Sequence, residues 1–170
     1  MAKIEVVNGY GWTTFHVRGE TCREDIASAI HAFFPKLVFP DVIWDLSEAS
    51  IASMSRTDFE EIASAAKTYE ELRGHAKTVF VASTPETFAL VCMYTGLAAM
   101  TELDVDYSAF TALEHAERWL VCNRAHRCAS PGAGADLHHC GEKACREVRL
   151  FQAARKINVA EPVALHAGRD

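Results

Sequence analysis

The sequence predicts an α/β fold with a mixed sheet, and three observations lead to that prediction. Two apolar runs, at residues 42–46 and 78–82, have the profile of strands buried on both faces of a sheet. Each run is followed by a polar turn and then by apolar residues at helical spacing. Strands that alternate with helices need crossover connections and therefore lie parallel. The glycine-containing segment 8–11 lies between two strand-like runs and adds an antiparallel hairpin, which makes the sheet mixed.

The first elements in chain order are the hairpin and a helix. Residues 4–7 and 12–18 are rich in β-branched and aromatic side chains and form the two strands of the hairpin. Thr21 and Glu24 have the spacing of a capping box and open the helix, which Pro35 ends. This helix follows the second hairpin strand directly, as expected for a crossover to the next strand.

The central unit is a strand, a serine-rich turn and a helix. The strand spans 42–46, and Ser55 with Asp58 forms a capping box for the helix, which we expect to reach about Arg73. Gly74 can adopt the left-handed conformation that ends a helix. Ligands and partners of parallel α/β sheets are most often bound at the carboxyl ends of the strands, so the turn after this strand is the first candidate for a working surface.

Two further strands complete a sheet of four to five. The strand at 78–82 leads to a helix that begins near Pro85, and we expect Cys92 to be a small core residue on its apolar face. A short strand at 105–110 precedes a helix that a capping box at Thr111 opens.

Length and composition favour one domain with an appendage. The chain has 170 residues, of which 49% are hydrophobic, enough for one substantial core in residues 1–120 with an extension at 121–170. No apolar run approaches the roughly 18 residues of a membrane span, and the N-terminus lacks a signal-peptide pattern. We therefore expect a cytoplasmic protein whose six cysteines are thiols or metal ligands.

The charge distribution argues against nucleic acid as a partner. Residues 1–120 contain 9 Lys/Arg and 18 Asp/Glu, whereas residues 121–170 contain 8 and 5. Affinity for a phosphate backbone requires a concentrated basic surface, which an acidic body does not offer.

The order of elements in residues 1–120 resembles the SpoIIAA-like family of small bacterial STAS-type domains. The most informative matching segments are Trp44-Asp45-Leu46, Met93-Tyr94 and Trp119-Leu120. The resemblance implies one sheet with helices packed against it and a regulatory, non-catalytic role in binding a protein partner. Related folds are also similar to lipid-binding Sec14-type domains, which implies an alternative role as carrier or sensor of a small apolar ligand.

Family members that act as anti-sigma-factor antagonists have a serine, phosphorylated by a partner kinase, shortly after the central strand. Ser55 matches this phosphoacceptor, although Ser53 and Arg56 replace the family's Asp and Gly. A phosphate at a helix N-terminus would meet unpaired backbone N–H groups. The alternative is that Ser55 is only an N-cap. With Asp45 and Ser47, these residues make up the candidate partner-binding or phosphoacceptor surface.

The extension contains a cluster of metal-ligand residue types. Its candidate zinc ligands are Cys122, Cys128, Cys140 and Cys145, with His126 or His139 as substitutes. The C-x5-C and C-x4-C spacings are looser than those of zinc knuckles. A terminal helix at 142–157, docked on the body, and a disordered extension are the other interpretations. We expect no cofactor in the body.

No enzyme motif is recognisable. The chain lacks a Walker A loop, a dinucleotide-binding glycine motif, a nucleophile elbow and a zinc-protease motif. The sequence therefore favours a binding module over an enzyme, and it leaves open whether the protein forms an oligomer.

Overall fold

The computed structural model describes residues 2–9, 11–99, 105–128 and 163–164. Five strands come from the body of the chain, and a two-residue strand near the C-terminus adds a sixth. The strands are β1 (Lys3–Asn8), β2 (Thr13–Glu20), β3 (Val42–Ser50), β4 (Ala76–Val81), β5 (Val105–Phe110) and β6 (Val163–Ala164). The helices are α1 (Arg23–Phe33), the 3-10 turn η1 (Phe34–Lys36), α2 (Arg56–Lys67), α3 (Glu70–Arg73), α4 (Pro85–Ala99) and α5 (Leu113–Cys128).

The sheet is mixed, as the sequence predicts. Its strand order is β5-β4-β3-β2-β1-β6, with β1 antiparallel to β2 and with β2, β3, β4 and β5 mutually parallel. β6 pairs antiparallel with β1 and was not predicted. The prediction of four to five strands is therefore correct for the body of the chain. The described sheet has one strand more, because β6 joins its edge.

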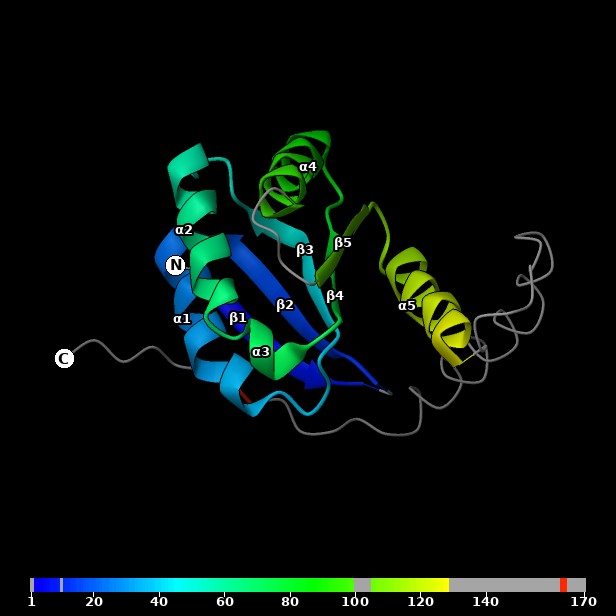
Figure 1. Ribbon diagram of the computed structural model, residues 1–170. Coiled ribbons are helices and arrows are strands. Elements are labelled where there is room, and N and C mark those ends of the chain that lie inside the picture. Colours follow the sequence, from blue (N-terminus) through cyan, green and yellow to red (C-terminus); the bar gives the residue numbers. More distant parts are fainter. Residues whose placement is uncertain (1, 10, 100–104, 129–162, 165–170) are drawn as a thin grey trace.

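Helices cover both faces of the sheet (Figure 1). On one face, α1, α2 and α4 pack on alternate residues of the strands, among them Phe15, Trp44 and Phe80. On the other face, α5 packs through Leu120 on Ile43 and on apolar residues of β4. Because β3 is covered on both sides, a continuous apolar run is the sequence expected for it.

Trp44 lies at the centre of the larger core. Its side chain is 4% exposed and stacks on Phe15 of β2, with ring centroids 4.4 Å apart. Phe80, its register partner on β4, continues the row across the sheet. The prediction that this segment is a buried central strand is confirmed.

Two predicted helix boundaries are wrong. The N-cap of α1 is Cys22, whose partner at N3 is Asp25, because the fully buried Thr21 turns its hydroxyl toward the carbonyl of Gly19. The helix that begins after Ser55 ends at Lys67, and α3 follows as a separate single turn. One continuous helix up to Arg73 was predicted.

Candidate functional site

Asp45 ties two neighbouring strands together. Its carboxylate lies 2.9 Å from Nδ1 of His16 on β2 and accepts a hydrogen bond from the backbone N–H of Ser47. Burial alone would raise the pKa of Asp45, but the hydrogen bonds from His16 and Ser47 outweigh it and hold the pKa below its usual value. The side chain alternates with that of Trp44 and so lies on the sheet face opposite α1, α2 and α4. The contacts of Asp45 are therefore explained by a structural role, which is to join β3 to β2.

Ser47 belongs to the strand and not to the turn. β3 runs on to Ser50 because its last residues pair with the end of β2, up to Glu20. The carbonyl of Ser47 accepts a hydrogen bond from the hydroxyl of Ser83, which follows β4. The predicted surface therefore includes the ends of two adjacent parallel strands.

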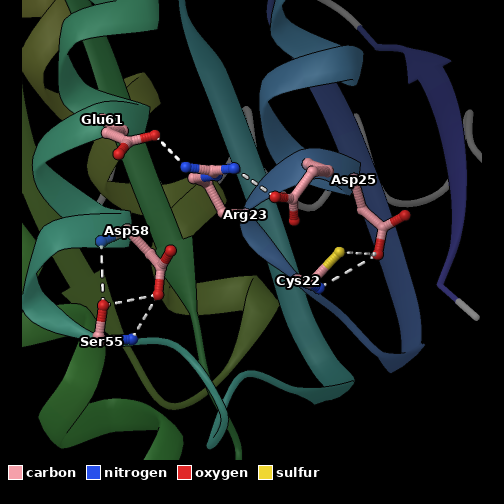
Figure 2. Close-up of polar contacts among 7 residues, drawn as sticks. Cys22, Arg23, Asp25, Ser55, Asp58 and Glu61 are labelled. Atoms are coloured by element: carbon pink, nitrogen blue, oxygen red, sulfur yellow. Dashed lines mark hydrogen bonds and ion pairs between the residues drawn. The ribbon is translucent and has the colours of Figure 1, made fainter.

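Ser55 is the N-cap of α2, as Figure 2 shows. Its hydroxyl accepts from the backbone N–H of Asp58 and donates to the Asp58 carboxylate at 2.7 Å. Hydrogen bonds from the hydroxyl and the backbone N–H of Ser55 hold the pKa of Asp58 below its usual value. Ser53 and Ser55 are exposed, while the guanidinium of Arg56 pairs with Glu60 one turn along the helix. The capping interpretation of Ser55 is confirmed, and its phosphorylation stays a prediction.

Arg23 links the N-terminus of α1 to the middle of α2. Its guanidinium pairs with Glu24 of α1 and with Glu61 of α2 (Figure 2). The exposed thiol of Cys22 donates to Asp25 beside this pair. Sequence reasoning missed this link because it depends on the docking of the two helices.

Half of the predicted zinc ligands lie outside the described residues. Cys122 is half-buried on α5, and the helix continues through His126 and Cys128. Cys140, Cys145 and His139 fall outside, as does the predicted helix at 142–157. Among described residues, no group of three or more His, Cys, Asp or Glu side chains could hold a metal ion.

Cys92 is exposed, contrary to expectation. The buried stripe of α4 is formed by Val91, Tyr94 and Ala98, and Cys92 lies one position off that stripe. Helix α4 is apolar around much of its circumference, so its buried face was not evident from the sequence.

A groove opens between the sheet and helices α1, α2 and α4. Sequence reasoning named Trp44, Leu46 and Tyr94 from its lining, but only as matching residues of the family resemblance. We call this space the groove. Its sheet side includes Trp44, Phe80 and Tyr107, and its helical side includes Ile30, Ile62 and Val91. The loop between β3 and α2 closes one part of it with Ile51 and Met54.

The groove has room for a small ligand. The groove contains an unfilled cavity of about 40 Å³. A cavity that holds one water measures roughly 10–15 Å³, so this cavity has room for about three waters. An apolar space of this kind favours an apolar occupant over water, because water would find few hydrogen-bonding partners there.

The polar groups of the groove gather in one part of it. Arg73 of α3 and Thr78 of β4 both line the groove, and an Nη2–H of Arg73 donates to Oγ1 of Thr78 at 2.9 Å. Tyr107 is the cross-strand partner of Thr78 on β5, and its ring lies 6.1 Å from that of Tyr94. Burial, together with the neighbouring Tyr107, raises the pKa of Tyr94, so its phenol stays neutral at physiological pH.

No relative is found in two comparisons with known proteins. No family model matches the chain, and no curated protein matches it. In the part of the chain that the structure describes, none of the helices combines the length and apolar character needed to cross a bilayer. The functional argument therefore rests on the geometry of the groove and of the surface around Ser55.

Proposed function

We propose that this protein is a non-catalytic binding module that holds a small apolar ligand in the groove, as a carrier or a sensor. The observation that carries the proposal is the groove itself, an apolar space between the sheet and three helices. Burial of apolar ligand surface contributes roughly 25 cal/mol for each Å² removed from water. The space is already present without a ligand, so binding needs little rearrangement.

The side chains around the groove favour binding over chemistry. Thr78 and the two tyrosines are its hydroxyl groups, and the oxygen of Thr78 accepts from the guanidinium of Arg73, a cation that cannot act as a general base. A hydroxyl needs an adjacent base to act as a nucleophile. The histidine nearest to an acid in the sheet, His16, pairs with Asp45 on the opposite face.

Methyl NMR tests the proposal directly. Ile26, Ile51, Met54 and Ile62 line the groove and provide methyl reporters along it. Titration with 1-hexanol should shift these methyl signals in a saturable way. The variant Ala66→Val, which places two carbons in the groove, should weaken binding. Shifts that spread over the whole protein without saturation, or that Ala66→Val leaves unchanged, would contradict a groove site.

A second candidate function is a protein-binding regulatory module under phosphorylation control. The exposed hydroxyl of Ser55, at the N-terminus of a twelve-residue helix, is the observation that favours it. Phosphorylation would remove the proton that Ser55 donates to Asp58 and bring a phosphate close to that carboxylate. The intact mass of protein purified from its natural host, followed by peptide mapping, tests this candidate. Unmodified Ser55 under all growth conditions would count against it.

A further inference from the structure

Arg73 brings a positive charge into an otherwise apolar environment. The residue is 6% exposed and lines the groove. Its Nε–H and Nη2–H groups donate to the carbonyl of Pro40 at 3.1 and 3.0 Å. Nη2 also contacts the carbonyl of Lys77 and the hydroxyl of Thr78. All of these acceptors are neutral, so the hydrogen bonds orient the guanidinium without neutralising it.

Among the described residues, no carboxylate forms an ion pair with Arg73. Asp41 is the acidic group whose field acts on it, but one carboxylate oxygen of Asp41 accepts from the backbone N–H of Lys77, and no ion pair joins the two side chains within 4.0 Å. The guanidinium also lies over the ring of Phe34, with 4.9 Å from Cζ to the centroid. A ring face offsets only part of the cost of removing a cation from water.

The electrostatics agree with a buried cation whose charge is offset only in part. Burial lowers the pKa of Arg73, and this effect outweighs the opposing influence of Tyr107, Tyr94 and Asp41. The residue nevertheless stays protonated, because the ordinary pKa of arginine is far above physiological pH. The hydrogen bonds of Arg73 to other described residues use Nε and Nη2, and Nη1 takes part in none of them.

We infer that the ligand of the groove is an apolar monocarboxylate, with its carboxylate at Arg73 and Thr78 and its apolar chain along the groove toward Met54. This inference rests on the proposed function and specifies the chemical class of the ligand. The guanidinium can donate to a carboxylate from Nη1, which is outside the hydrogen bonds described above, and a hydrogen bond between charged groups is stronger than one between neutral groups. One guanidinium balances one negative charge, so a monoanion fits better than a phosphate dianion, which would leave one charge uncompensated.

Four probes with the same six-carbon chain separate the contribution of charge from that of apolar contact. They are hexanoate, 1-hexanol, hexylamine and hexyl phosphate, titrated at pH 7 into the full-length protein. Methyl signals of Met54 and Ile62 report occupation of the groove, and the side-chain Nε–H signal of Arg73 reports the polar end. We expect hexanoate to bind about 10-fold or more tightly than 1-hexanol, and hexylamine to bind weakest. The Arg73 signal should shift with hexanoate alone among the first three.

The possible outcomes test separately whether the groove binds a ligand, whether the ligand carries a carboxylate, and whether it is a monoanion. Equal affinity for hexanoate and 1-hexanol would leave the groove as a ligand site and overturn the carboxylate inference. Tighter binding of hexyl phosphate than of hexanoate would overturn the choice of a monoanion. Failure of all four probes to shift the methyl signals would overturn the proposed function as well.

A pair of arginine variants adds an independent measurement. Arg73→Gln removes the buried charge, and Arg56→Gln removes an exposed arginine that pairs with Glu60 as a matched control. We expect Arg73→Gln to abolish the preference for hexanoate over 1-hexanol and Arg56→Gln to preserve it. Because Arg73→Gln also removes hydrogen bonds to Pro40, its fold must first be checked by its methyl spectrum. If it is unfolded, the probe series in the unaltered protein decides.

Discussion

The substitution Ala66→Val tests whether the groove is empty space in the folded protein. Ala66 lines the groove from the last turn of α2. Valine adds two carbons, each worth about 0.8 kcal/mol when buried without strain, which makes about 1.6 kcal/mol. The lower helix propensity of valine costs up to about 0.7 kcal/mol. We therefore expect the free energy of unfolding to rise by about 1 kcal/mol.

Ala63→Val is the matched control. Ala63 lies on the same helix three residues earlier, is 2% exposed and does not line the groove. The same two carbons must then enter a filled part of the core, where overpacking costs about 1–3 kcal/mol. The propensity cost is similar, so the two variants should differ in unfolding free energy by at least about 2 kcal/mol.

Urea unfolding at 25 °C measures both variants. A slope of roughly 2 kcal/mol/M would place the midpoint of Ala66→Val about 0.5 M above that of the unaltered protein and the midpoint of Ala63→Val below it. Equal destabilisation of the two variants would show that no usable space exists at Ala66. The groove and the ligand proposal would then both be untenable.

Three further predictions concern the remaining site residues. Ser55→Ala should lower the unfolding free energy by about 1 kcal/mol through loss of the cap to Asp58, while Ser55→Asn should stay close to the unaltered protein; equal urea midpoints for both would refute the capping role. The pKa of Asp45 is lowered in the folded state, so its contribution to stability is present above the unfolded pKa of about 3.9 and is lost as pH falls through the folded value. As the pH is lowered below 4, the urea midpoint of Asp45→Asn should therefore fall less steeply than that of the unaltered protein. An equally steep fall in both proteins would contradict this. Trp44→Ala should cost about 3–5 kcal/mol by calorimetry, since it removes the stack on Phe15, and a loss below about 1 kcal/mol would be inconsistent with the packing.

The strands could be predicted because their sequences carry local signals. The apolar run that contains Trp44 is continuous since β3 is covered on both faces, and the hairpin follows from the glycines that precede β2. The helix starts were located to within a residue or two, but the cap of α1 was assigned to Thr21. Thr21 and Cys22 are adjacent candidates, and the choice depends on burial of the threonine beside Gly19, which is a tertiary effect.

The resemblance implied an apolar ligand site, but the residues that line the groove could not be predicted because no local pattern encodes them. The lining comes from four helices, the 3-10 turn, three strands and a connecting loop, so the groove exists only after the helices have docked. Arg73 has the sequence context of an exposed residue at a helix C-terminus, immediately before Gly74. Its burial depends on the carbonyl of Pro40, 33 residues earlier in the chain. A charged residue shortly before a buried apolar run, at residues 79–82, is the sequence signal that could have drawn attention to it.

The groove and the surface around Ser55 meet in one short loop. Ile51 and Met54 line the groove, and a backbone hydrogen bond from the Met54 N–H to the Ile51 carbonyl closes the turn between them. Ser53 lies inside this turn and is exposed, and Ser55 follows it directly as the cap of α2. The two proposed functions therefore share one structural element, because the loop that closes the groove also carries the exposed serines. A sensor of the proposed kind would need such a shared element, since a ligand shifts a partner equilibrium only through contacts that differ between two states.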